Sequence, residues 1–425
     1  MKIDTGSTAW MLASTALVLL MTPGLAFFYG GMTRVKTVLN MMMMSWIAII
    51  TVTIAWVLYG DSLSFGKGNG FIGGFEYLGE HGLVGSASRV AGIPDLVFSA
   101  FQLTFAVITV ALISGAIADR TRFGAWTVFT VGWATLVYFP VAHWVWGGGW
   151  LSSLGIEDFA GGTVVHVNAG AAGLALALVL GKRRGWDKEP MRPHNLPLVL
   201  LGAGLLWFGW FGFNAGSELA ADGTAALAFM NTQVATAAAA GGWLLVERFR
   251  DGKPTTLGVA SGAVAGLVAI TPACAFIAPW AAILLGGAAG VLCCYAIGLK
   301  HRLGFDDALD VVAVHGVGGV TGLLATGLLA TTIINSSGAN GLLYGGGLTQ
   351  FGRQALAAAV AVCYSFALTW LIAWALDKSI GLRVAPHHEL AGIDEAEHAE
   401  TAYEHGRASG HFTGSLSRVH SAGHD

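Results

Sequence analysis

The chain is poor in charge. Only 11% of its 425 residues are Asp, Glu, Lys or Arg, whereas a soluble globular protein carries about 25%. Together with 55% hydrophobic residues, this scarcity indicates that lipid surrounds much of the protein. A net charge of −3 gives no support for a nucleic-acid partner. A soluble enzyme is also disfavoured, because hardly any catalytic constellation lies outside the hydrophobic runs. We therefore expect no enzymatic activity and no cofactor.

Cysteine is rare as well. The four cysteines are Cys274, Cys293, Cys294 and Cys363, and all lie within apolar stretches. Their spacing matches neither a zinc site nor a disulfide framework. We expect all four to be buried apolar side chains, and we expect no metal centre.

Long runs without charge are abundant. A membrane-spanning helix needs about 20 apolar residues. Eight charge-free runs fit one helix each: 5–33, 37–60, 96–118, 124–147, 159–181, 195–217, 223–246 and 354–376. The run 255–299 is long enough for two helices, with Pro272 and Pro279 marking the turn between them. The run 311–352 divides into a span that ends near Ile333 and a Gly-rich loop. The sequence thus predicts an all-α membrane protein of eleven spans.

Lys and Arg set the predicted orientation, because they gather in cytoplasmic segments. With the N-terminus outside, an odd number of spans places the C-terminus inside. Of the 22 Lys and Arg, only Lys2, Lys67, Arg89 and Arg353 then fall on the outer side. We therefore predict an N-out, C-in topology.

Two spans carry the same pattern, H-x-x-x-G-x-x-G-L. It begins at His166 in the fifth span and at His315 in the tenth. FYGG at 28–31 and FNAG at 213–216 repeat with the same offset of five spans. An odd offset reverses the direction through the membrane. Spans 1–5 and 6–10 are therefore predicted to be inverted repeats, with the eleventh helix at the periphery.

The two histidines are the first candidate functional residues. Ionisable residues inside a membrane usually have a function, and inverted repeats place their site near the midplane, at their interface. His166 and His315 would meet there and share one hydrogen bond, offering a donor and an acceptor. The alternative is a pair of core histidines that only holds the two halves together.

The motifs along the chain closely resemble those of the ammonium transporter family (Amt/MEP, with the Rhesus glycoproteins as distant relatives). The resemblance extends from about Trp10 to His398 and rests on PGLAFFYGG, GAIADRTRF, VAHWVWGGGWL, DFAGGTVVHVNAG, GKRRGW, PHNLP, GWFGFNAGS, GKPTTLG, TPACAFI, DDALDVVAVHGVGG and GLRV. It implies eleven spans, a homotrimer in the cell membrane and one pore per subunit. Residues 1–376 would form the transport domain and residues 377–425 a cytoplasmic regulatory tail.

The resemblance also implies site residues. An outer ammonium site falls on Phe105, Trp146 and Ser217, and a gate of two phenyl rings falls on Phe105 and Phe213. Phe101, Gln102 and Trp210 are plausible neighbours of the pathway. Aromatic faces attract ammonium by about 1–2 kcal/mol when the ion is partly dehydrated, and a serine hydroxyl can accept one of its hydrogen bonds. Taken singly, each aromatic residue could instead serve in interhelical packing or in an interfacial belt.

Asp158 matches an acidic residue that the family has beside this site. One interpretation is direct: its charge attracts the cation and assists proton release. The other is a helix N-cap that orders nearby carbonyl groups. We favour the cap, because that is the ordinary use of Asp at such a position.

The resemblance predicts ammonium transport. Ammonium binds outside and loses a proton at the gate, and ammonia then passes His166 and His315 to be protonated again inside. The proton could cross separately along the histidines. Alternatives are an electroneutral Rhesus-type channel for ammonia or carbon dioxide, and an ammonium sensor. The tail is expected to be ordered to about Tyr403, to couple subunits and to bind a PII-type regulatory protein.

Overall fold

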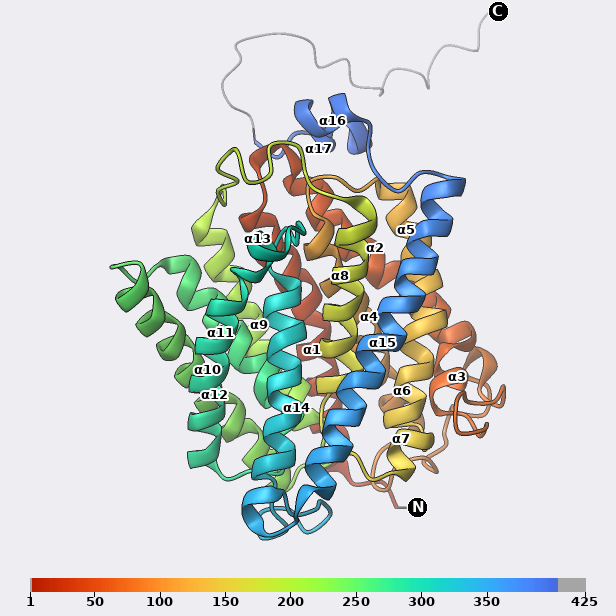
Figure 1. Ribbon diagram of the computed structural model, residues 1–425. Helices are drawn as coiled ribbons and strands as arrows, with labels where there is room; N and C mark the ends of the chain where they lie inside the picture. The colour runs from red at the N-terminus through yellow and green to blue at the C-terminus, as the bar shows by residue number, and fades with distance from the viewer. Residues whose placement is uncertain (1, 404–425) are drawn as a thin grey trace, which may run out of the picture.

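The protein is an assembly of helices that run roughly side by side in the computed structural model (Figure 1). The structure describes residues 2–403. No β-strand forms among them, and Thr121 and Arg383 share a single antiparallel bridge.

Nine helices of the described chain are long and apolar enough to cross a membrane, so the protein is a multi-pass membrane protein. Three of them are single α-helices, namely α1 (Thr5–Met32), α9 (Leu196–Gly216) and α15 (Leu348–Ser379). Four combine an α-helix with one adjoining short helix: α4 (Asp95–Ile113) with η4 (Ser114–Ile117), η6 (Gly162–Val167) with α8 (Asn168–Leu180), α12 (Pro279–Ala296) with α13 (Leu299–Leu303), and η7 (Val312–Val317) with α14 (Gly318–Leu329). Two consist of successive pieces: α2 (Val38–Ala55) with α3 (Asp61–Phe65), and α5 (Phe123–Trp133) with α6 (Phe139–Val145) and α7 (Trp150–Ser153). Two further helices lie where the seventh and eighth spans were predicted. They are α10 (Gly223–Arg250), which is less apolar, and α11 (Thr256–Ile270), which is shorter.

The loops and short elements define two faces. We call the face that holds the N-terminus the N-terminal face, and the face that holds α16 (Pro386–Ala391) and α17 (Ile393–His398) the tail face (Figure 1). The predicted turn at Pro272 and Pro279 is confirmed, because α11 ends at Ile270 and Pro279 begins α12. The predicted tenth span ends earlier than expected, at Leu329, where Ala330 turns to extended backbone.

The helices α1 and α9 pack against each other through glycines at their ends. A Cβ on Gly31, near the end of α1, would lie 2.8 Å from the backbone nitrogen of Val199 at the start of α9. A Cβ on Gly216, at the end of α9, would lie 2.7 Å from Cβ of Ser14 in α1. The same contact therefore occurs twice with the two helices exchanged, and both occurrences need the absence of a side chain.

One span is longer than its charge-free run. The second run ends before Asp61, but the helix continues through η2 (Trp56–Gly60) into α3. Arg89 donates to both carboxylate oxygens of Asp61, at 2.7 and 2.6 Å. Its guanidinium also lies 4.6 Å from the ring of Tyr77 and 4.7 Å from that of Phe98. Because the charge of Asp61 is paired, it does not end the helix.

The prediction for the cysteines is wrong at one position. Cys274, Cys293 and Cys294 are buried, but Cys363 is exposed on α15. This helix packs across the outside of α8 and α14, as Figure 1 shows, so one of its faces is turned away from the protein. A charge-free run does not reveal which face that is.

The described part of the tail packs on the ends of membrane helices. The carboxylate of Asp394 accepts hydrogen bonds from the backbone nitrogens of Leu39 and Asn40, at 3.0 and 2.8 Å. Glu397 accepts one from the backbone nitrogen of Phe123 at 3.0 Å. Both acids thus satisfy free N–H groups at the starts of α2 and α5. The prediction for the chain beyond Tyr403 lies outside the described residues.

Candidate functional site

The two predicted histidines meet in the interior. His166 is fully buried and His315 is 3% exposed. Their Nδ1 atoms are 3.3 Å apart, and the rings lie 5.4 Å apart with their planes inclined at 22°. One Nδ1 must carry the hydrogen and the other must accept it, so the two imidazoles take complementary tautomers. Nε2 of His166 has no hydrogen-bond partner among the described residues.

Glycines permit this approach. A Cβ on Gly170, four residues after His166, would lie 2.4 Å from Cα of Gly316. A Cβ on Gly319, four residues after His315, would lie 3.1 Å from the backbone nitrogen of Val167. The first glycine of each copy of the pattern therefore faces the residue that follows the other histidine. The two histidine segments cross where neither has a side chain in the way.

Both histidines lie in π-helical turns, η6 (Gly162–Val167) and η7 (Val312–Val317). Such turns are uncommon and occur often at functional sites. An aspartate lies shortly before each turn, Asp158 before η6 and Asp307 before η7. Both oxygens of Asp158 accept from backbone nitrogens of Gly161, Gly162, Thr163 and Val164, at 2.5–3.2 Å. The geometry agrees with the capping role. Burial raises the pKa of Asp158, and these four hydrogen bonds counteract the rise.

Asp307 has the corresponding position before the second histidine, and the sequence analysis missed it. Its carboxylate accepts from the backbone nitrogens of Val311 and Val312, at 3.1 and 2.7 Å. Burial, with a further contribution from the charge of Asp310, raises the pKa of Asp307 to about 6. The signal was present, because Asp158 and Asp307 each precede a histidine of the repeat by the same interval.

The predicted aromatic residues form one connected stack on the N-terminal side of the histidines. The rings of Phe105 and Phe213 are stacked with centroids 4.1 Å apart. Trp146 contacts Phe105 edge to face at 5.8 Å, and Phe101 contacts it from another side at 4.9 Å. Both phenylalanines of the predicted gate are buried, with Phe105 1% and Phe213 0% exposed. The Phe213 ring lies between those of Phe105 and His166, at 4.1 Å from the first and 6.0 Å from the second.

Trp210 continues the stack to the histidines. Its ring lies 5.4 Å from that of His166 and is inclined by 19°, while Phe213 lies 6.0 Å from the same imidazole. The indole nitrogen of Trp210 donates to Oγ1 of Thr271 at 3.0 Å, which fixes the ring. Thr271 carried no sequence signal, because it comes from a segment far along the chain.

The remaining predicted residues lie beside this stack. Nε1 of Trp146 donates to the backbone oxygen of Asp158 at 2.9 Å. Oγ of Ser217 donates to the backbone oxygen of Phe213 at 2.8 Å, so its lone pairs remain able to accept. Gln102 is buried in α4, next to Phe101. The residue after Ser217 is acidic, Glu218. Burial, with a further contribution from the charge of Asp222, raises the pKa of Glu218 to about 7.

A narrow cavity of about 10 Å³ lies at the histidines, close to the minimum for one water molecule. Its wall is apolar apart from His166 and His315, and otherwise consists of Met21, Leu25, Phe28, Ile108, Leu112, Val165, Leu206, Trp210, Phe213 and Val264. A charged ion would be strongly disfavoured in such a space.

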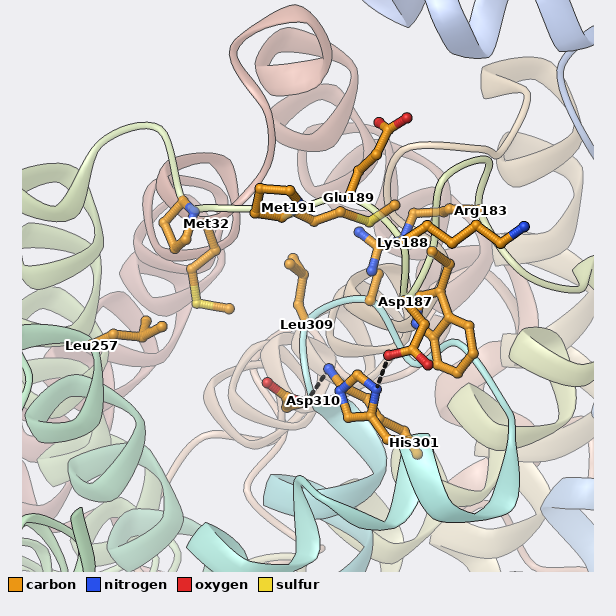
Figure 2. A pocket seen from close by; sticks show the side chains of 15 residues that line it. Met32, Arg183, Asp187, Lys188, Glu189, Met191, Leu257, His301, Leu309 and Asp310 are labelled. Atoms are coloured by element: carbon orange, nitrogen blue, oxygen red, sulfur yellow. Dashed lines mark hydrogen bonds and ion pairs between the residues drawn. The ribbon is translucent and has the colours of Figure 1, made fainter. Parts of the chain in front are cut away.

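A larger pocket of about 460 Å³ opens on the tail face (Figure 2). It adjoins the loop after α8 and includes Arg183, whose guanidinium bonds Asp306 at 2.9 Å and Asp119 at 3.2 Å. Burial disfavours the charged form of Asp306, but the hydrogen bond and charge of Arg183 outweigh it and lower the pKa of Asp306. No group of three His, Cys, Asp or Glu side chains in the described chain could hold a metal ion.

Comparisons with known proteins agree with this architecture. The model of the Ammonium Transporter Family matches residues 9–403. An ammonium transporter of Mycobacterium tuberculosis is 56% identical, over 96% of this chain and 92% of its own length. One from Bacillus subtilis is 50% identical, over 94% of this chain and 98% of its own. The crystal structure of Candida albicans Mep2 superposes with a TM-score of 0.86 at 35% identity, covering 91% of this chain and 88% of Mep2. The chain therefore belongs to the ammonium transporter family and is a membrane-embedded ammonium transporter.

Proposed function

We propose that the protein recruits ammonium at its N-terminal face, removes a proton there and conducts ammonia past His166 and His315 to the tail face. One observation carries this proposal: the two imidazoles share a contact of 3.3 Å directly beneath a closed aromatic stack, in a cavity that is otherwise almost entirely apolar. Such a path suits a small neutral molecule that can donate and accept hydrogen bonds.

Trp146, Phe105 and Ser217 form the proposed recruitment site. The faces of the two rings attract the cation, and the serine hydroxyl accepts one of its N–H groups. The edge-to-face contact of 5.8 Å between Trp146 and Phe105 holds both rings beside the gate. Asp158 supports the site indirectly, because its backbone oxygen fixes Trp146 and its carboxylate caps η6.

The gate of Phe105 and Phe213 provides selectivity. Potassium has the same charge as ammonium and a similar size, but it cannot lose a proton. It would have to cross the apolar cavity as an ion, which is strongly penalised. Ammonium can cross as ammonia, and the histidine pair provides a route for the separated proton.

The proposed topology has eleven spans, with the N-terminal face outside and the tail face in the cytoplasm. Spans 1–5 and 6–10 form inverted repeats, and α15 is peripheral. The distribution of Lys and Arg supports this orientation in the cell membrane. The contacts of Gly31 and Gly216, and those of Gly170 and Gly319, support the repeats because each contact occurs twice with the partners exchanged.

The assembly is proposed to be a homotrimer with one pore per subunit. Residues 377–425 would act as a regulatory tail, and a PII-type protein would bind at the cytoplasmic face. Contacts of the tail acids Asp394 and Glu397 with α2 and α5 support this role, because they give the tail a direct mechanical link to membrane helices.

The proposal is tested with purified protein in liposomes on a solid-supported membrane. An ammonium pulse should produce a transient current, whereas a potassium pulse of the same concentration should produce none. Ammonia entry without current, followed with an internal pH dye, would instead favour an electroneutral gas channel. An absence of both signals would overturn the proposed function.

A further inference from the structure

The pocket on the tail face continues the path of the histidine cavity. Phe28 of α1 lines the histidine cavity, and Met32, one turn later, lines the tail-face pocket. Along α11, Val264 lines the cavity, and Leu257, two turns towards the tail face, lines the pocket. In the segment of the second histidine, His315 lines the cavity, and Asp310, five residues earlier, lines the pocket. Each of these three segments lines the histidine cavity and, closer to the tail face, the pocket. We therefore take the pocket as the tail-face mouth of the pathway.

A cationic side chain is held at this mouth. Nζ of Lys300 donates to Oδ1 of Asp310 at 2.6 Å and to the backbone oxygen of Asp307 at 3.1 Å. The dashed line at Asp310 in Figure 2 marks the first of these contacts. The Lys300 and Asp310 side chains are 13% and 25% exposed, so the pair is mostly shielded from water and screened less than a surface pair.

The head group of lysine is chemically close to ammonium. Both are compact, strongly hydrated cations that donate hydrogen bonds and accept none. A carboxylate oxygen and a carbonyl oxygen that hold Nζ at hydrogen-bonding distance can therefore hold a free ammonium ion in its place. Lys300 thus marks a cation site by occupying it.

The repeat gives an independent reason to place a cation site here. On the N-terminal face, the backbone oxygen of the capping residue Asp158 accepts from Trp146 at 2.9 Å, beside the proposed recruitment site. On the tail face, the backbone oxygen of the capping residue Asp307 accepts from Lys300 at 3.1 Å. Each histidine segment thus begins with a capped turn whose first carbonyl faces an N–H donor at a mouth of the pathway.

We propose that the Asp310 carboxylate and the Asp307 backbone oxygen form a second ammonium-binding site at the tail-face mouth, which the ammonium group of Lys300 occupies between transport events. This inference rests on the proposed function for the origin of the ammonium. Lys300 competes with ammonium that forms at this mouth and displaces it into the pocket. A tethered competitor acts at an effective concentration in the mM range, so ammonium on the tail side inhibits transport only at comparably high concentrations.

The decisive variant is Lys300→Met, which keeps most of the apolar stem and removes the competing cation. Thallium(I) serves as the probe, because it is a monovalent cation that can be located by anomalous scattering. In crystals soaked with thallium acetate, a peak should appear at Asp310 in Lys300→Met. It should be absent from the unmodified protein and from the double variant Lys300→Met/Asp310→Asn.

The functional readout is inhibition by ammonium preloaded on the tail side of oriented liposomes. We expect half-inhibition of Lys300→Met at a concentration roughly tenfold lower than for the unmodified protein, because the effective concentration of the tethered competitor is lost. Arg302→Met is the matched control, since it removes one charge from an exposed position of the same short helix, α13 (Leu299–Leu303). It should behave like the unmodified protein.

Lys300→Gln, which also removes the charge, replaces Lys300→Met if the latter is not recovered as folded protein. No thallium at Asp310 in either variant, or unchanged inhibition, would overturn the inner site. Thallium binding is measured without transport, so a failure of the proposed function leaves this part of the test intact.

Discussion

Asp158 and Asp307 cap the two π-helical turns that carry the histidines, and each stands at the same distance in sequence before its histidine. This relationship extends the repeat from the histidines to the residues that position them.

The cap at Asp307 should be as important for the fold as that at Asp158. We expect Asp307→Ala to lower stability by about 1–2 kcal/mol, as the loss of an N-cap does, and to reduce transport by displacing η7. Asp307→Asn retains an accepting oxygen and should therefore lose less stability than Asp307→Ala. Thermal unfolding in detergent measures the effect, with Asp158→Ala as the matched variant. Unchanged stability of Asp307→Ala would mean that its two hydrogen bonds do not hold the turn.

Trp146 should govern ammonium affinity at the N-terminal face. Trp146→Leu removes the aromatic face, and we expect the half-saturating ammonium concentration to rise about five- to thirtyfold, as a cation–π attraction of about 1–2 kcal/mol implies. Trp146→Phe keeps an aromatic face but loses the hydrogen bond to the backbone oxygen of Asp158. Its half-saturating concentration should lie between those of the unmodified protein and Trp146→Leu. Trp144→Leu is the control, because Trp144 instead donates to the backbone oxygen of Phe71 and contacts the ring of Tyr364. Equal affinities for Trp146→Leu and the unmodified protein would contradict the recruitment site.

Because of Glu218, the affinity for ammonium at the N-terminal face should depend on pH. Its pKa is raised to about 7, first by burial and then by the charge of Asp222. Above that pH the carboxylate is charged and attracts the cation beside Ser217, and below it the carboxyl is neutral. We expect affinity to be about two- to fivefold weaker at pH 6 than at pH 8, which is the size of a partly screened charge interaction. Ammonium predominates over ammonia throughout this range. In Glu218→Gln the two affinities should be equal, and an undiminished pH dependence would exclude Glu218 as its source.

Two glycine substitutions should have opposite effects. Gly170→Ala would place Cβ 2.4 Å from Cα of Gly316 and force the histidine segments apart, so we expect lower stability and loss of transport. A Cβ on Gly204, inside α9, meets no atom within 4 Å. Gly204→Ala should therefore leave transport intact and stabilise the helix by about 0.5–1 kcal/mol. Thermal unfolding and uptake measured together test the pair, and a stable, active Gly170→Ala would refute the close crossing.

Much of this architecture follows from the sequence because charge is so unevenly distributed. Long charge-free runs mark the membrane helices, and the repeated pattern links His166 to His315. Asp307 was within reach of the same reasoning, since it completes the repeat. The continuation of the second span through Asp61 into α3 could not be predicted, because it depends on the partner Arg89.

Contacts between distant segments explain the other gaps. Thr271 fixes Trp210, and Lys300 reaches Asp310, only after the chain has folded. Cys363 was misjudged because a hydrophobic run gives no information on which face of a peripheral helix is turned outward. The aromatic stack followed from a family resemblance, since a single Phe or Trp in a membrane helix usually serves in packing.

The central claim is that the histidine pair carries the transported ammonia and its proton. The most direct measurement is the current evoked by ammonium and by potassium in liposomes that contain His166→Leu/His315→Leu. We predict that the ammonium current disappears from this double variant, while the protein remains folded by size-exclusion chromatography. An ammonium current of unmodified size, with potassium still excluded, would contradict the account.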